Sequence, residues 1–240
     1  TPTQWQRDQF PTALQSQLTV IHEGIDWPLM ASLRRRGLPR PSCLPPDPDL
    51  EVVTYVSRGF EEYRGFPQAM QAIALLQRQR PKLHALIVGH DCVAYGDNRR
   101  DGRSWGEWAK QEVSLDPDRT HWLGILQDAE YQEVLACSTV HLYLTVPFVL
   151  SWSLLEAMAA GCALVGSSTA PVLEVLEDGI SGLLVDFFDS EEQASALSQL
   201  LDNPALRQNL AAAAKKRAQD YTASKGIARW RSILGLELNT

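Results

Sequence analysis

The chain has 240 residues, of which 45% are hydrophobic and 21% charged, and this balance excludes a disordered chain, a collagen and a coiled coil. Its 29 acidic and 22 basic residues leave a net charge of −7, the wrong sign for a protein that binds nucleic acid over its surface. A chain of this length forms one or two domains and needs no disulfide bonds to stabilise its core.

The four cysteines lie far apart in the sequence, at Cys43, Cys92, Cys137 and Cys162. They form neither the close pairs of a zinc site nor a disulfide framework, so we expect no metal and a reducing compartment, which favours the cytoplasm. The longest apolar stretches are broken by polar residues and fall short of the ~20 residues that cross a membrane. We therefore expect no transmembrane segment.

The first fifty residues show no regular alternation of elements. A short strand is predicted at 18–21, and the segment 34–49 is rich in Arg and Pro. We expect residues 1–50 to be a lead-in segment from a preceding domain and residues 51–240 to form the domain itself. Because the chain also lacks an initiating Met and an apolar signal core, we expect it to be a piece of a longer protein.

From Glu51 onward, two kinds of segment alternate. Short apolar segments predict strands at residues 52–56, 84–88, 120–123, 139–144, 163–166 and 182–185. Helical spacing predicts helices at residues 67–80, from about 105, 128–136 (with Asp128 as its N-cap), 153–160, 190–201, 204–219 and 222–234. This order is typical of an α/β protein with a Rossmann-like parallel sheet and helices on both faces. Such sheets bind ligands beyond the carboxyl ends of their strands, so candidate residues belong to the loops that follow strands.

Two arginines follow the first predicted strand, each next to a glycine, at Arg58 and Arg64. A guanidinium donates a planar pair of N–H groups to phosphate oxygens and stays charged at any working pH. The two side chains are therefore candidates for binding a diphosphate. The alternative is a pair of surface arginines that form ion pairs with Glu61 or Glu62.

A second candidate site is the loop 145–153, which joins a predicted strand to a predicted helix. Free backbone N–H groups and the positive end of the helix dipole favour an anion at such a helix start. Glu156 lies in the first turns of this helix among apolar residues and needs a partner if it is buried. A ribose diol is one suitable partner, since a carboxylate accepts from both hydroxyls; a local N–H or an arginine is the other.

The sequence Leu-Leu-Glu-Ala-Met-Ala-Ala-Gly at 154–161 resembles the sugar-nucleotide helix of the family-4 retaining glycosyltransferases (glycosyl transferases group 1). Similar stretches follow in the family's order, at Arg58, Arg64-Gly65, 86–89, 121–124 and 174–185. The resemblance covers residues 18–235. It implies the GT-B fold of two Rossmann-like domains, of which this chain is the C-terminal, donor-binding half.

The resemblance also implies roles for residues of this chain. Arg58 and Arg64 are the expected catalytic residues, because they neutralise the diphosphate of the nucleotide sugar and stabilise it as a leaving group. Glu156 binds the ribose, and the base lies near Gly89 and Ile125. The remaining expected substrate-binding residues form the loop before the helix, with phosphate bound by the last three backbone N–H groups, at Phe148, Val149, Leu150, Ser151 and Trp152. No cofactor and no metal are expected, since the arginines supply the positive charge.

Two departures from the family bear on activity. Phe148 stands where the family has a glutamate that contacts the donor sugar, and a phenyl ring accepts no hydrogen bond. The chain is also about half the length of a complete GT-B enzyme, so the N-terminal domain that binds a carbohydrate or lipid-linked acceptor is missing. We expect the chain to bind a nucleotide sugar but to transfer nothing by itself. The complete enzyme is expected either free in the cytoplasm or held at the inner membrane through the missing domain.

The leading hypothesis is a glycosyltransferase that moves a sugar from a nucleoside-diphosphate sugar to a hydroxyl group. The alternatives are a non-catalytic module that binds nucleotide sugars, for which Phe148 is the motive, and a GT-B-type epimerase of UDP-sugars. A Rossmann-type oxidoreductase is less favoured, because no glycine-rich fingerprint follows the first strand. The long loop 92–103 is either a lid over the donor or a mobile surface loop, and the last helix, with Trp230 and Ile233, is expected to pack toward the missing domain.

Overall fold

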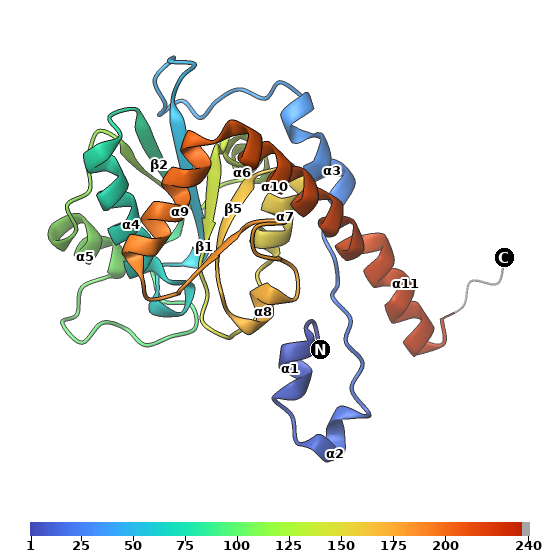
Figure 1. The fold of residues 1–240 in the computed structure, drawn as a ribbon. Coiled ribbons are helices and arrows are strands. Elements are labelled where there is room, and N and C mark those ends of the chain that lie inside the picture. The colour runs from blue at the N-terminus through green and yellow to red at the C-terminus, as the bar shows by residue number, and fades with distance from the viewer. Residues whose placement is uncertain (237–240) are drawn as a thin grey trace.

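The computed structural model describes residues 1–236, so the last four residues of the expected domain lie outside the described part. A six-stranded sheet forms its centre, with all neighbouring strands parallel and in the order β3-β2-β1-β4-β5-β6 (Figure 1). The strands are β1 (Glu51–Gly59), β2 (Leu83–His90), β3 (Thr120–Gly124), β4 (Val140–Tyr143), β5 (Ala163–Ser167) and β6 (Leu183–Val185). All six predicted strands are confirmed.

Helices cover both faces of the sheet, which confirms the expected Rossmann-like α/β class. The chain alternates faces because successive side chains of a strand point to opposite sides. In β1, Val53 and Tyr55 pack with α4 (Phe66–Gln79) and α9 (Ser190–Asp202), while Val52 faces α6 (Asp128–Cys137). The other helices are α1 (Gln4–Asp8), α2 (Thr12–Gln15), α3 (Trp27–Ser32), α5 (Trp105–Glu112), α7 (Trp152–Ala160), α8 (Ala170–Leu173), α10 (Pro204–Arg217) and α11 (Ala223–Leu234).

The helix that carries the family-like sequence, α7, begins at Trp152, one residue before its predicted start, and ends at Ala160 as predicted. The side chain of Ser151 accepts from the N–H of Ser153 at its start, and Gly161 ends it in the left-handed conformation (φ 76°), which suits glycine. The predicted cap of α6 was wrong by one residue. Gln127 is the N-cap and forms a capping box with Glu130, so Asp128 is the first helical residue.

The first fifty residues are more closely attached to the sheet domain than a lead-in suggests. Ile25, Met30 and Leu33 are buried in the same core cluster as α7. The strand predicted at 18–21 is wrong, because these residues pair with no strand of the sheet in the described part of the chain. Ile21 is buried, but its N–H donates to the carbonyl of Thr1 (2.8 Å).

A close backbone contact joins residues 22–25 to the start of α11. Ile25 exchanges hydrogen bonds with the chain on either side of Thr222: its N–H donates to Tyr221 (2.9 Å) and its carbonyl accepts from Ala223 (2.8 Å). Gly24 has a φ of +86°, and a Cβ there would collide with the backbone of Thr222. A Cβ at Gly226 would collide in turn with the carbonyl of Glu23. The two glycines are therefore required for this contact.

Within residues 1–236, no helix is both long enough and apolar enough to cross a membrane. The helix α11 extends from the body of the molecule (Figure 1) and leaves four large apolar side chains exposed, at Ile227, Trp230, Ile233 and Leu234.

A buried cluster of polar side chains links β1, β4 and the end of α6. The hydroxyl of Thr54 lies 2.7 Å from Ser138 Oγ and 2.8 Å from His141 Nδ1. His141 is completely buried, and the loss of hydration lowers its pKa to about 4. The imidazole is therefore neutral in the folded chain at pH 7.

This burial predicts a loss of stability in acid. The unfolded chain binds more protons than the folded chain between pH 6.5 and about 4, so the free energy of unfolding falls as the pH falls through this range. The contribution of His141 amounts to roughly 3 kcal/mol at the acid end. Urea unfolding at several pH values gives the free energy of unfolding as a function of pH, and this free energy should depend less steeply on pH in His141→Asn. Part of the dependence should remain, because burial also lowers the pKa of His22, His84 and His121. An unchanged slope would contradict the assignment.

Candidate functional site

A cavity of about 570 Å³ opens at the carboxyl ends of β1 and β4. After β1 the chain adds β2 and β3 on one side of this strand, and it then adds β4, β5 and β6 on the other side. The strand order therefore reverses between β1 and β4. Open α/β sheets bind their ligands at such a point. The lining residues come from both strand ends and the loops around them: Glu23, Val56, Ser57, Arg58, Arg64, Tyr95, Tyr143, Leu144, Val149, Leu150, Ser151 and Trp152.

The Arg64 side chain is buried at the floor of this cavity and is held by neutral oxygens. Its Nη1 donates to the hydroxyls of Tyr143 (3.3 Å) and Thr145 (3.1 Å) and to the carbonyl of Val149 (2.9 Å). Among residues 1–236, no carboxylate forms an ion pair with it. A buried cation without a counter-ion is costly, so the site is suited to an anionic ligand.

Local backbone geometry places Arg64 there. It ends a short 3₁₀ turn, Glu62–Arg64, and its carbonyl accepts from the hydroxyl of Tyr55 in β1 (2.8 Å). Gly65 follows with φ +61°, and a Cβ there would press against Leu144. Glycine at position 65 is therefore a requirement of this turn, because the chain passes close to the end of β4 before it enters α4.

Arg58 lies at the rim of the same cavity and is exposed. Its Nη1 donates to the hydroxyl of Tyr95 (3.4 Å). The alternative in which the arginines pair with Glu61 or Glu62 is wrong for the described residues. The Glu61 carboxylate accepts instead from the backbone N–H groups of the loop that carries Tyr95.

The start of α7 closes the cavity on the side of β4. The N–H of Ser151 donates to the hydroxyl of Tyr143 (3.0 Å), so it would have to exchange or share this acceptor in order to bind phosphate. Trp152 is the first helical residue, and its N–H has no acceptor within the helix. Its indole Nε1 donates to the carboxylate of Glu23. Leu150 is buried and Val149 half-buried at the cavity wall.

Glu156 is half-buried on α7 and does not line the cavity. Its Oε2 accepts from the hydroxyl of Tyr131 (2.8 Å), a partner other than the N–H or arginine that was the alternative to ribose. Burial raises the pKa of Glu156 from its ordinary value, and the Tyr131 hydrogen bond opposes this shift. Gly89 and Ile125 also lie outside the lining, at the carboxyl ends of β2 and β3: a Cβ at Gly89 would collide with the Ser57 carbonyl, and Ile125 is exposed.

Phe148 lies behind the cavity wall rather than in it. Its ring packs against Tyr63 (5.8 Å between ring centroids) and Tyr95 (5.2 Å). The guanidinium carbon of Arg64 is 5.3 Å from the centre of the ring, close enough for an attractive cation–π contact. The structure therefore brings Arg58, Arg64 and the loop 149–152 together at one cavity, with Phe148 as packing beneath them.

Six residues that line the cavity were not predicted as site residues. Val56, Ser57 and Leu144 belong to the ends of β1 and β4 or lie next to them, and the other three are Glu23, Tyr95 and Tyr143. Tyr143 is the last residue of β4, a position from which a side chain readily reaches the ligand edge of the sheet. Tyr95 and Glu23 come from irregular segments, where only the fold decides which side chains meet. Of the three, therefore, only Tyr143 had a signal in the sequence, namely its place at a strand end.

The geometry places two arginines and the start of α7 around one cavity at the crossover of a Rossmann-like sheet, and comparison with known proteins gives the family. The family model described as "Glycosyl transferases group 1" matches residues 44–217. The chain belongs to this family. A second model, "Glycosyl transferase family 4 group", matches residues 1–30.

Curated relatives agree with this assignment. The chain is 29% identical over 219 residues to a D-inositol 3-phosphate glycosyltransferase of Nocardioides, covering 86% of this chain and 46% of the relative. It is 28% identical to a phosphatidyl-myo-inositol mannosyltransferase of Mycolicibacterium smegmatis, covering 90% of this chain and 50% of the relative. The chain thus spans about half the length of these relatives.

Solved structures confirm the fold, with GT-B glycosyltransferases as the neighbours. Anabaena HepE, crystallised with UDP and glucose, has a TM-score of 0.70 at 20% identity, over 90% of this chain and 56% of HepE. The C-terminal domain of a glycosyl transferase group 1 protein from Francisella tularensis has a TM-score of 0.63 at 16% identity, over 82% of this chain and 97% of that domain. The expected α/β fold with a Rossmann-like parallel sheet is therefore confirmed, and its structural neighbours are GT-B glycosyltransferases.

The unpaired arginines predict that the cavity binds a small polyanion. Arg58→Ala should lower the affinity for inorganic pyrophosphate about tenfold or more, because it removes a charged donor from the rim. Isothermal titration calorimetry at low ionic strength measures the effect. Arg231→Ala, an exposed position on α11, is the matched control and should bind like the unmodified chain. If both variants lost the same pyrophosphate affinity, the loss would come from the change in net charge, and the role of Arg58 in the cavity would be contradicted.

Proposed function

We propose that this chain is the donor-binding part of a retaining glycosyltransferase, and that its cavity holds the diphosphate of a nucleoside-diphosphate sugar. The observation that carries the proposal is the buried guanidinium of Arg64, which faces the cavity with no carboxylate partner among residues 1–236. A diphosphate supplies the missing negative charge and hydrogen-bond acceptors.

The two arginines have distinct parts in the proposed reaction. Arg64 is held rigidly by three oxygens, so it needs little reorganisation as charge develops on the departing diphosphate. Arg58 is exposed and closes on the ligand from the rim. Together they supply the positive charge that a divalent cation provides elsewhere, so we propose that no metal is required. The bond between the anomeric carbon and the diphosphate oxygen breaks, and the acceptor hydroxyl forms the new bond on the same face, which retains the configuration of the sugar. The hydroxyl proton passes to the departing diphosphate oxygen.

We assign the ribose to Glu156. Its Oε2 accepts from the Tyr131 hydroxyl, while Oε1 accepts from no residue among 1–236 and is left for the ribose hydroxyls. The raised pKa of Glu156 reflects burial, and hydrogen bonds from a ribose diol would stabilise the charged form. The base then lies toward Gly89 and Ile125, at the carboxyl ends of β2 and β3.

The acceptor belongs to the part of the enzyme that this chain does not include. Relatives named for transfer to inositol phosphate and phosphatidylinositol support a carbohydrate or lipid-linked hydroxyl as acceptor. We propose that the exposed Ile227, Trp230 and Ile233 of α11 pack against the missing domain. Four free cysteines favour a reducing compartment and hence the cytoplasm.

The ribose assignment predicts a difference between two ligands. Glu156→Gln should weaken binding of the preferred nucleotide among UDP, GDP and ADP about tenfold, since one charged acceptor is lost. Binding of inorganic pyrophosphate should stay unchanged, because that ligand has no ribose. Calorimetric titration of both ligands gives the comparison, with Tyr131→Phe as a control for the hydrogen bond itself. If Glu156→Gln weakened pyrophosphate binding as much as nucleotide binding, Glu156 would support the structure of the site and would not bind the ribose.

A second candidate function is a non-catalytic module that binds nucleotide sugars, and the observation behind it is Phe148. Titrating the chain with the three nucleotides tests what both candidates share, and binding by none of them would contradict both. Product analysis of the complete enzyme then separates them. A transferred sugar of retained configuration supports the glycosyltransferase, while binding without transfer supports the module.

The position of Phe148 predicts that restoring the family's glutamate harms the phosphate site. A carboxylate at this position would lie beside Arg64 and form the ion pair that the site lacks. Phe148→Glu should therefore weaken pyrophosphate binding about tenfold. Phe148→Leu keeps the position neutral and should cost less. If Phe148→Glu binds pyrophosphate as well as the unmodified chain and the complete enzyme gains transfer, the module hypothesis is favoured.

A further inference from the structure

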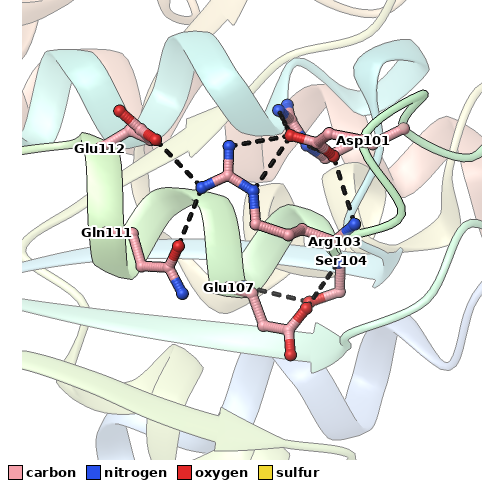
Figure 2. Close-up of polar contacts among 7 residues, drawn as sticks. Asp101, Arg103, Ser104, Glu107, Gln111 and Glu112 are labelled. Atoms are coloured by element: carbon pink, nitrogen blue, oxygen red, sulfur yellow. Dashed lines mark hydrogen bonds and ion pairs between the residues drawn. The ribbon is translucent and has the colours of Figure 1, made fainter.

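The long connection between β2 and α5, residues 91–104, is fixed at both ends rather than free. Near α5, the carboxylate of Asp101 accepts from Arg99 and Arg103, and Arg103 also donates to Gln111 and Glu112 (Figure 2). The guanidinium of Arg99 lies over the ring of Trp105, at 4.5 Å. These contacts do not support a mobile surface loop.

Near β2, the loop is attached to the site through the buried carboxylate of Glu61. Its Oε2 accepts from three successive backbone N–H groups, those of Ala94 (3.1 Å), Tyr95 (2.8 Å) and Gly96 (3.0 Å). Glu61 lies two residues after the end of β1, between Arg58 and Arg64 in the sequence, so it connects the loop to the segment that carries both arginines. Its other oxygen, Oε1, is buried without a hydrogen-bond partner in the described structure.

This attachment places Tyr95 between the two arginines. Its ring packs on Phe148, and its centre is 5.7 Å from the guanidinium carbon of Arg64. Its hydroxyl accepts from Arg58. A phenol has one proton to donate in addition, and no described residue accepts that proton. Because Tyr95 also lines the cavity, this O–H group is available to a ligand there.

We propose that Tyr95 is a third phosphate ligand of the site, donating its hydroxyl proton to a phosphate oxygen that Arg58 and Arg64 also bind. The proposal rests on the proposed function, since it takes the ligand to be a diphosphate. Phe148 and Glu61 are positioning residues in this scheme: the first packs on the tyrosine ring and the second holds the backbone of the loop. The loop thus supplies a wall of the donor site.

The test compares two tyrosines that pack on the same phenyl ring. Tyr95→Phe removes only the hydroxyl, and the affinity for inorganic pyrophosphate should fall about tenfold. Tyr63→Phe is the matched control, because the Tyr63 ring contacts Phe148 while the residue does not line the cavity; its affinity should not change. Calorimetry with pyrophosphate, UDP, GDP and ADP measures both variants, and an unchanged affinity of Tyr95→Phe would overturn the proposal.

A double-mutant cycle tests whether Glu61 acts through Tyr95. Glu61→Gln should also weaken pyrophosphate binding, and the double variant should lose no more than the larger single loss, because both changes remove the same contact. Additive losses would overturn the positioning role of Glu61, because a purely structural effect does not depend on the tyrosine hydroxyl. Thermal unfolding of each variant verifies that the fold persists.

The failure of this proposal and the failure of the proposed function give different results. If the unmodified chain binds pyrophosphate and Arg58→Ala weakens it, the diphosphate site stands whatever Tyr95→Phe does. If the unmodified chain binds neither pyrophosphate nor a nucleotide, both proposals fail.

Discussion

The guanidinium of Arg64 is buried at the carboxyl edge of the sheet with three neutral oxygens as its partners. A charge in this position requires compensating dipoles, and here they come from β4 and from the loop that follows it. The 3₁₀ turn that presents Arg64 depends on a hydrogen bond from the Tyr55 hydroxyl and on glycine at position 65. One side chain therefore links the turn after β1 to the end of β4 and the loop that follows it, in addition to the backbone pairing of the two strands.

The same side chain explains how an aromatic residue fits where the resembling family has a carboxylate. Beside Arg64, the Phe148 ring contributes a cation–π contact without neutralising the charge. The ring also packs against Tyr95 and Tyr63. Through these contacts Phe148 connects Arg64 to the long loop after β2, which carries Tyr95.

Much of the fold was predictable from the sequence, because parallel strands are short apolar runs and helices carry their own start and stop signals. Arg58, Arg64 and residues 149–152 were predictable for a related reason, since they lie at the end of β1 or in the connections that follow β1 and β4. Tyr95 and Glu23 were not, because each reaches the cavity from an irregular segment whose path is decided by tertiary contacts. The engagement of the Ser151 N–H with Tyr143 was equally hidden, since residue type does not reveal how a backbone group is paired. The role of residues 25–33 in the core was missed because Arg- and Pro-rich flanks obscured a short buried helix.

The paired glycines at Gly24 and Gly226 connect the rim of the cavity to α11. Glu23, which holds the Trp152 indole at the entrance, belongs to the segment that these glycines allow to lie against the first turn of the helix. With no side chain between the two backbones, neither segment has room to slide past the other. Local unfolding of one segment therefore requires local unfolding of the other. The amide protons of Ile25 and Ala223, which both form hydrogen bonds across this contact, should exchange with solvent as one cooperative unit.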